Sequence, residues 1–467
     1  CEEHHWFGRS KDLFRLFQQP LVPMVDKQGN WHTIGPLQLS LKPGGHGAIW
    51  KLARDEGIFE WLKSRGCKKA LVRQINNPLA GLDYGLLAFT GIGYRKNMAF
   101  GFSSCCRVVK AAEGIIVLVE KEDGRIALTN IEYCDFEKFG IKDEPIHPDQ
   151  PYSRFTSNTN ILFVDLEAVE KAVESHPFPG LLMNLKSVGA QSGLGRLEST
   201  MQNIADAFAE PKPKEIPLKT AKTFATYNFR HKTISVAKKA FLPGKSFLET
   251  PEQCFYELLS ANRELLTECG FSLPNEIPIE EYLEKGPSVL FLYHPALGPL
   301  YSIIRQKMRH GSLSRGAELF LEIAEIDFEH VSVEGSLQVI AERVIGATNS
   351  ESILEYQPQV GRCLLQDVSV KNAGVDWGHC SPYWKMELER RETVLIELKG
   401  YSEFDARGCQ FEGSHHFIVE NGTRLIVRQK GKELLLERTP LSEKSYWEYS
   451  WEKENKIRLR KDRERSE

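Results

Sequence analysis

The sequence predicts an α/β domain followed by an all-β domain, because its apolar pattern changes along the chain. From Trp31 to about Glu210, strand-like apolar runs alternate with helical stretches, the pattern of a doubly wound sheet. After Gly311 the apolar residues alternate over short runs broken by frequent glycines. That texture predicts many short strands, in a β-helix or a sandwich, and on spacing alone we favour a left-handed β-helix.

Individual elements follow from local patterns. The clearest apolar runs predict strands over Lys69–Ile75, Gly114–Val119 and Asn160–Val164. Helical periodicity predicts helices over Asp165–Ser175 and around residues 251–267. Asn421-Gly422 tolerates positive φ, which predicts a hairpin turn between the apolar runs on either side. The last residues, Glu452–Glu467, are of mixed charge and predict a solvated helix end or a disordered tail.

Changes in composition and in the apolar pattern divide the chain into four predicted segments. Residues 211–220 hold three prolines in a charged run, which is typical of a surface connection. We predict an α/β core over 1–240, a helical connecting region over 241–310, an all-β domain over 311–440 and a charged tail over 441–467. Because the chain begins with Cys1 rather than Met, we expect it to be cut from a longer one.

Composition and charge exclude two classes of protein. The chain has 467 residues, 41% apolar and 26% charged, as in ordinary globular proteins of more than one domain. No apolar run approaches the ~20 residues that span a bilayer, so no membrane partner is expected. With 60 Lys and Arg against 63 Asp and Glu, the chain has no broad basic field, so no nucleic-acid partner is expected.

The segment Lys42-Pro43-Gly44-Gly45-His46-Gly47 is the strongest candidate for a ligand site. Adjacent glycines let backbone N–H groups turn towards an anion or a flat base and approach it closely. Residues 48–54 read as the start of a helix, whose N-terminus attracts phosphate. Lys42 and His46 could each donate to phosphate oxygens. A plain glycine-rich turn is the structural alternative.

Polar residues near predicted strand ends are further candidates. Gln19 follows an aromatic pair, and its amide could match both a donor and an acceptor of uracil. Asn76, Asn77 and Asp83 follow a strand, where α/β sheets gather ligands, although an Asx turn would equally explain the asparagines. Glu132 and Asn160 could reach sugar hydroxyls. Glu198 is expected at a helix start, where the helix dipole alone explains a carboxylate.

The order of these segments resembles the UDP-sugar pyrophosphorylase family over roughly residues 10–240. The resemblance is carried by Gln19 to Pro23, Pro43 to Gly47, Asn76-Asn77, Glu132-Tyr133, Asn160-Ile161 and Arg196-Leu197-Glu198, the last expected as a helix. The runs 5–8 and 41–52 are most similar to the plastid branch that supplies UDP-glucose for sulfolipid synthesis in plants. The resemblance implies a nucleotidyltransferase with a Rossmann-like mixed sheet, followed by a β-helix, in the chloroplast stroma.

The resemblance also implies a reaction and its substrates. Glucose 1-phosphate would attack the α-phosphorus of UTP with Mg²⁺ as cofactor, giving UDP-glucose and pyrophosphate by positioning and electrostatics. N-Acetylglucosamine 1-phosphate is the alternative sugar. An inactive nucleotide-sugar-binding regulator and a structural assembly module are alternative classes.

Residue roles carry over one position at a time. The resemblance implies that Gln19 reads uracil, that Gly45 packs under the base with His46 near the phosphates, and that Glu132 and Asn160 hold the sugar. Gly44, in the same turn, is also expected to bind substrate. Catalysis is assigned to His46 and to a phosphate-binding lysine, Lys238, with Lys239 and Lys186 as rivals. Asn76 stands where the family has a metal-binding Asp, so Asp83 is the predicted metal ligand, while Asn76 and Asn77 are expected to bind substrate. The family's glycine-rich triphosphate loop is absent from this sequence.

Overall fold

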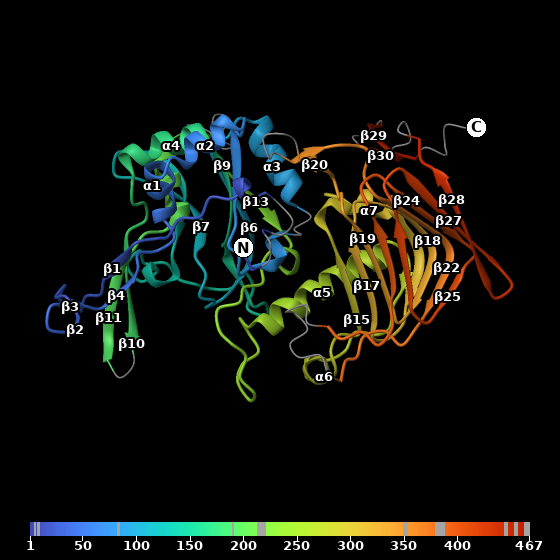
Figure 1. Ribbon diagram of the computed structural model, residues 1–467. Coiled ribbons are helices and arrows are strands. Elements are labelled where there is room, and N and C mark those ends of the chain that lie inside the picture. The colour runs from blue at the N-terminus through green and yellow to red at the C-terminus, as the bar shows by residue number, and fades with distance from the viewer. Residues whose placement is uncertain are drawn as a thin grey trace. The chain divides into compact units, whose positions relative to one another are not determined.

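The computed structural model describes residues 1–3, 6, 10–81, 85–188, 191–212, 221–348, 354–378, 388–442, 447–452 and 456–461 (Figure 1). Backbone contacts divide the chain into two compact units. The sheet unit comprises Phe14–Ile75 and Gly85–Ile234. The β-helix unit comprises Cys1–Leu13, Asn76–Tyr84 and Ser235–Glu467. Both units are discontinuous in sequence, whereas the predicted segments are contiguous.

The short segment after strand β5 (Lys69–Val72) explains part of that discontinuity. Asn77 is 4% exposed, and its Oδ1 accepts a hydrogen bond from Ser235 N at 3.0 Å. Leu79 is buried against Leu258 and Ala261 of helix α5 (Pro251–Glu268). Burial of an apolar side chain and satisfaction of a buried amide therefore hold residues 76–81 in the β-helix unit.

The sheet unit is built on one mixed sheet of seven strands. Its order is β12-β8-β7-β9-β6-β13, with β5 paired to β9; β13 runs parallel to β6 and the other neighbours are antiparallel. The strands are β6 (Phe100–Val108), β7 (Ile115–Glu120), β8 (Arg125–Ile131), β9 (Tyr152–Asp165), β12 (Glu210–Pro211), β13 (Thr223–Asn228) and β5. The predicted α/β class is confirmed.

Helices cover both faces of this sheet. Successive residues of a strand point to opposite faces, so an apolar run such as that in β9 needs a covering layer on each side. Leu162 and Val164 share a core with α1 (Ala48–Asp55), α2 (Ile58–Ser64) and α4 (Leu166–Ser175). Phe163, between them, packs edge-on against Phe89 of α3 (Leu86–Arg95) on the other face. The helix predicted over Asp165–Ser175 is confirmed, with Asp165 as its N-cap.

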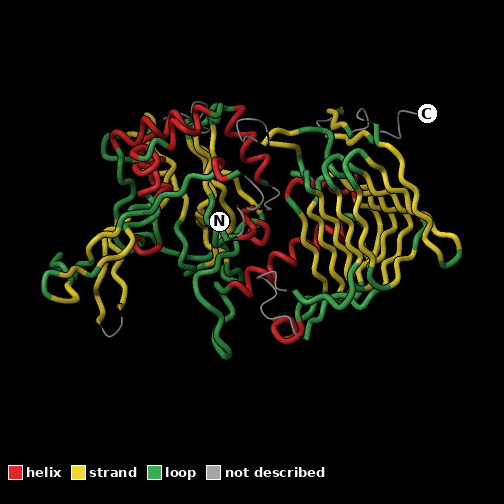
Figure 2. The backbone as a smooth tube through the Cα atoms, viewed as in Figure 1, coloured by secondary structure: helices red, strands yellow, loops and turns green. Residues whose placement is uncertain are grey.

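Small two-stranded sheets extend from this unit. Strand β10 (Leu182–Val188) pairs with β11 (Gln191–Glu198), which Figure 2 shows as a projecting arm. Strands β1 (Leu21–Pro23) and β4 (Leu41–Pro43) pair with each other, as do β2 (Thr33–Gly35) and β3 (Gln38–Leu39). Glu198 therefore ends a strand, and the expected helix start at Arg196 to Glu198 is wrong, because this segment pairs with β10.

The predicted β-helix is confirmed, since the chain alternates coil by coil between two parallel sheets (Figure 2). One sheet has the order β15-β17-β19-β23-β26 and the other β14-β16-β18-β22-β24-β27-β28, with β25 on β22. The first contains β15 (Val289–Tyr293), β17 (Ala317–Glu322), β19 (Ser336–Ala341), β23 (Val394–Leu398) and β26 (His415–Val419). The second contains β14 (Phe271–Ser272), β16 (Met308–Leu313), β18 (Glu325–Glu334), β22 (Arg362–Lys371), β24 (Glu403–Arg407), β25 (Gln410–Glu412), β27 (Thr423–Lys430) and β28 (Glu433–Pro440).

The parallel pairing places residues of the same chemical type above one another in successive coils. Ile326, Cys363, Phe404 and Leu425 pair in one inward row and are all buried. Such rows supply a continuous apolar core without a helix, which explains the frequent short strands in the sequence. Helices α6 (Ile279–Lys285) and α7 (Tyr301–Lys307), with the paired strands β20 (Gly346–Thr348) and β21 (Leu354–Tyr356), complete the unit.

The predicted hairpin at Asn421-Gly422 is wrong. Strand β26 pairs with β23 and strand β27 with β24, so the two lie in different sheets and the turn is a corner of the coil. Gly422 does have positive φ, at 74°. The antiparallel hairpin lies one strand later, between β27 and β28.

The tail prediction is also wrong for residues 457–460. Strand β30 (Ile457–Arg460) pairs with β29 (Glu448–Trp451), and Leu459 is buried with Trp447 and Leu364. Gln306 of α7 donates to Ile457 O and accepts from Leu459 N, each at 3.0 Å. Its amide thus makes the two backbone hydrogen bonds that a neighbouring strand would make with β30. Among the described residues, no helix combines the length and apolarity needed to cross a membrane.

Candidate nucleotide site

The predicted glycine turn lies directly after β4 and before α1. We call residues 44–47 the Gly turn. Gly44 N donates to Pro20 O at 2.9 Å, so the turn lies against the segment that carries Gln19. The side chains of Gln19 and Lys42 are exposed, and Lys42 has no ion-pair partner within the described chain.

The glycines are required by a close approach of another segment. A Cβ on Gly45 would lie 2.7 Å from Ser199 N, and one on Gly47 would lie 2.6 Å from Ser199 C and from Thr200 N. Gly47 N donates to Ser199 O at 2.8 Å, and Ser199 N donates to Gly44 O at 3.0 Å. Gly45 also has φ 95°, which L side chains rarely adopt. The backbone of Ser199 thus fixes the Gly turn.

This contact changes what a Gly45 substitution can test. On the sequence alone, Gly45→Val would probe the space under a bound base. Here the added side chain meets the Ser199 backbone first, so loss of ligand affinity would report collapse of the turn as readily as a filled base site.

The Gly turn leaves two backbone donors unused. Within the described chain, the N–H groups of Gly45 and His46 donate to no backbone carbonyl. They lie at the start of α1, where the partial positive charge of the helix adds to their attraction for an anion. An oxyanion placed there would gain two hydrogen bonds.

His46 is held by the same neighbouring segment. Met201 N lies 3.1 Å from His46 Nδ1 and donates to it, which assigns the ring proton of the neutral form to Nε2. Burial lowers the pKa of His46, and the carboxylate of Glu198 only partly opposes this shift. His46 is therefore a neutral side chain at pH 7 with one N–H left to donate.

Glu132 follows β8 and is anchored by two amides. Its Oε1 accepts from Asn130 Nδ2 at 2.8 Å and from Gln202 Nε2 at 2.7 Å. Burial raises the pKa of Glu132 despite both hydrogen bonds. Within the described residues Oε2 takes no hydrogen bond, so the second oxygen is open to a hydroxyl or an N–H of a ligand.

Residues 198–203, which we call the Ser199 segment, therefore bring the Gly turn, His46 and Glu132 together. Ser199 fixes the turn, Met201 binds His46 and Gln202 binds Glu132. Sequence reasoning missed Asn130, Met201 and Gln202. Asn130, in β8, lies two residues before Glu132, so both side chains point to the same face. This alternation could have been used to identify Asn130 from the sequence.

Asn160 lies in a separate network of the sheet unit. It occupies a register shift of β9 at φ 57°, and its Oδ1 accepts from Asn158 Nδ2 at 2.8 Å. The predicted strand began at Asn160, whereas β9 begins at Tyr152. No hydrogen bond within the described residues joins Asn160 to Glu132 or to the Gly turn.

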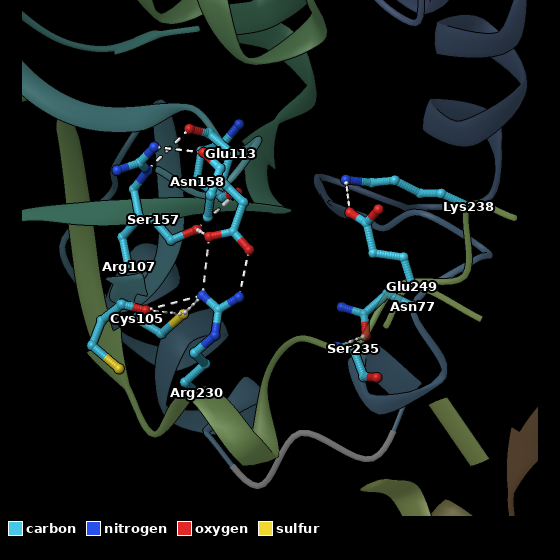
Figure 3. A network of polar contacts seen from close by, with 12 residues as sticks. Asn77, Cys105, Arg107, Glu113, Ser157, Asn158, Arg230, Ser235, Lys238 and Glu249 are labelled. Atoms are coloured by element: carbon cyan, nitrogen blue, oxygen red, sulfur yellow. Dashed lines mark hydrogen bonds and ion pairs between the residues drawn. The ribbon is translucent and has the colours of Figure 1, made fainter. Parts of the chain in front are cut away.

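A partly buried ionic network lies beside that strand, and sequence reasoning did not identify it. Arg230 forms a two-pronged ion pair with Glu113, which also accepts from Ser157 Oγ at 2.8 Å (Figure 3). Arg107 holds Asp143 through two bonds of 2.7 Å and donates to Glu113 O at 3.1 Å. Burial acts to raise the pKa of Glu113, but Arg230, Ser157 and Arg107 together outweigh it, so the pKa lies below its ordinary value.

Of the predicted site residues that the structure describes, Asn76, Asn77 and Lys238 belong to the β-helix unit. Asn76 Nδ2 donates to Ala237 O at 3.1 Å, and Asn77 Oδ1 is engaged by Ser235 N. Lys238 pairs with Glu249 at 2.8 Å on the surface (Figure 3). Asp83 and the side chain of Lys186 lie outside the described residues. The ligand-binding roles of all these residues stay predictions.

Gly47→Ala is expected to destabilise the protein, because the methyl group overlaps the backbone of Ser199 and Thr200. Gly47 has an ordinary helical φ of −66°, so the contact alone carries the effect. We expect a loss of about 1–3 kcal/mol, measured by urea unfolding. Gly91→Ala is the control: its Cβ meets nothing within 4 Å in α3, so it should stabilise by about 0.5–1 kcal/mol. Equal effects of the two changes would contradict the packing argument.

Lower pH is expected to cost stability through His46. Because the folded pKa is depressed, the unfolded chain binds the proton more readily, and stability falls as pH drops through the unfolded value of about 6.5. The free energy of unfolding should fall less between pH 7.5 and 5.5 in His46→Gln than in the native protein. The exposed His147→Gln should leave that difference unchanged; a difference unaltered by His46→Gln would refute the assignment.

Comparison with known proteins gives the family. A family described as UTP–glucose-1-phosphate uridylyltransferase matches residues 5–251, and one described as UGP3-like, C-terminal hexapeptide repeats matches residues 308–462. The chain is 40% identical to UTP–glucose-1-phosphate uridylyltransferase 3, chloroplastic, of Arabidopsis thaliana, covering 96% of this chain and 54% of that protein. It therefore spans about half the length of this relative.

Other similarities are more distant. UDP-N-acetylglucosamine diphosphorylase 2 of Arabidopsis thaliana is 28% identical over 29% of this chain and 26% of its own length. The uridine diphosphate N-acetylglucosamine pyrophosphorylase structure from Trypanosoma brucei has 17% identity and a TM-score of 0.47, covering 65% of this chain and 60% of that one. Since the first family match spans more than half of the residues, the chain belongs to the UTP–glucose-1-phosphate uridylyltransferase family.

Proposed function

We propose that the protein transfers uridylyl from UTP to glucose 1-phosphate, giving UDP-glucose and pyrophosphate. The observation that carries this proposal is the Gly turn, fixed by Ser199 with the N–H groups of Gly45 and His46 unused. Membership of the uridylyltransferase family and the name of the Arabidopsis relative support the same reaction.

In this proposal the sheet unit binds and orients the nucleotide. The two free N–H groups and His46 Nε2–H donate to phosphate oxygens. Gln19 contacts uracil, and Glu132 Oε2 accepts from a hydroxyl or N–H of the UDP-sugar. The attacking oxygen belongs to the sugar phosphate, so the protein supplies alignment and no nucleophile.

We propose Mg²⁺ as the cofactor, bound mainly by substrate phosphates. The asparagines predicted near it fit a metal poorly, because Asn77 Oδ1 already accepts from Ser235 N and Asn76 donates to Ala237 O. Within the described residues no group of three His, Cys, Asp or Glu side chains could hold a metal ion. No step of the mechanism is assigned to the ion.

The cellular role is proposed by analogy with the relative named above. We propose a chloroplast location and a supply of UDP-glucose for sulfolipid synthesis, on the chloroplastic name of that relative and the resemblance to the plastid branch. UDP-N-acetylglucosamine synthesis is the second candidate, favoured by the partial match to a UDP-N-acetylglucosamine diphosphorylase.

The reaction is tested by pyrophosphate release from UTP with either sugar 1-phosphate, using protein expressed from its complete gene. We expect turnover with glucose 1-phosphate and a larger kcat/KM for it than for N-acetylglucosamine 1-phosphate. The reverse preference would assign the second candidate. UDP-glucose binding without turnover would show a nucleotide-sugar-binding regulator and refute the proposed reaction.

Glu132→Ala is expected to lower kcat/KM by about 10- to 100-fold, because it removes an acceptor of a charged hydrogen bond to the bound ligand. Glu120→Ala is the matched control, since this exposed glutamate ends the paired strand β7 and pairs with Lys212 on the surface. The control should retain the native rate. Equal rates in the two variants would remove Glu132 from the site.

A further inference from the structure

The β-helix unit contains a cavity of about 460 Å³ lined by five cationic side chains. It is lined by the outer face of the sheet that contains β16, β18, β22, β24 and β27, by the end of α7, and by β30 with Trp447. The cations are Arg305, Arg309, Arg424, Arg458 and Lys461. Among the lining residues that the structure describes, two are carboxylates, Asp327 and Glu403. We call this cavity the basic pocket.

Parallel register places a row of alternating charges along this sheet. Glu325, Arg362, Glu403 and Arg424 pair in succession on β18, β22, β24 and β27. Glu403 is 2% exposed and lies between two arginines, with Arg362 Nε at 2.9 Å and Arg424 Nε at 2.5 Å. The terminal nitrogens of Arg424 donate to no acceptor within the described residues, and its side chain is 29% exposed. The last member of the row therefore presents unused donors to the pocket.

The second carboxylate is also shared by two cations. Asp327 lies 2.9 Å from Arg309 and 2.5 Å from Lys461, and Lys461 also lies over the ring of Trp447. Arg309 also pairs with Glu329, which lies outside the lining, at 3.3 Å. Within the described lining, both acids are thus already matched, and five cations stand against two carboxylates.

The other two arginines add to that excess at the rim. Arg305 comes no closer than 3.8 Å to Glu268, and Arg458 pairs with Glu452 at 3.2 Å. Their side chains are 51% and 54% exposed, so water keeps both pairs weak. Both guanidinium groups can turn towards a ligand.

We propose that the basic pocket binds a small molecule that carries a phosphate or sulfate-type oxyanion. Guanidinium groups match such oxyanions with two parallel hydrogen bonds, and a bound anion would offset the repulsion among neighbouring cations. The volume lies within the range of small-molecule sites and exceeds what one ion needs. This site belongs to the β-helix unit alone and does not depend on the proposed uridylyl transfer.

The test is isothermal titration of the protein at low ionic strength with inorganic phosphate, pyrophosphate, glucose 1-phosphate and sulfate. We expect saturable binding that weakens at least about tenfold in the double variant Arg305→Gln, Arg458→Gln, since two charge-assisted contacts are lost. Both residues are exposed, so the variant should fold. Tighter binding of a phosphate probe than of sulfate assigns a phosphorylated ligand, and the opposite order assigns a sulfated one.

Arg315→Gln is the matched control, because Arg315 is 57% exposed and pairs with one glutamate, Glu281, at 3.1 Å. It should bind every probe as the native protein does. The proposal is overturned if no probe binds saturably, if the control loses as much affinity as the double variant, or if the double variant keeps native affinity and stoichiometry.

Discussion

The candidate site depends on one close approach, between the Gly turn and the backbone of Ser199. Without Cβ atoms on Gly45 and Gly47, Ser199 can exchange backbone hydrogen bonds with residues 44 and 47. Once Ser199 is fixed, the next residues have little freedom, so Met201 N reaches His46 and Gln202 reaches Glu132. His46 and Glu132, which are distant in sequence, are thereby both positioned by the Ser199 segment.

Burial gives these two side chains the same electrostatic tendency. It lowers the pKa of His46 and raises the pKa of Glu132, so each moves towards its neutral form. Met201 and Gln202 orient these two side chains, which can then offer a donor and an acceptor to a ligand. This character agrees with uridylyl transfer, in which the substrates bring both the nucleophile and most of the charge.

Sequence reasoning succeeded where the signal is local. The helices predicted over Asp165–Ser175 and around residues 251–267 are both present, as α4 and α5, and each depends on neighbouring residues. Asn421-Gly422 carries the turn chemistry of a hairpin, yet it forms a coil corner, because a turn encodes positive φ and not the sheet that the next strand joins. Gln202 could not be found, since its contact with Glu132 exists only after the Ser199 segment has packed on the Gly turn.

The β-helix shows how a fold can generate a site without a motif. Parallel stacking repeats one register position on every coil, so charges at that position meet their neighbours and are stable only if they alternate. The alternation holds through Glu325, Arg362, Glu403 and Arg424, after which antiparallel β28 places neutral Thr439 opposite Arg424. The end of the parallel stack thus leaves one arginine without a second carboxylate. An external anion can supply that charge, whereas the sequence around Arg424, read alone, is an ordinary amphipathic strand.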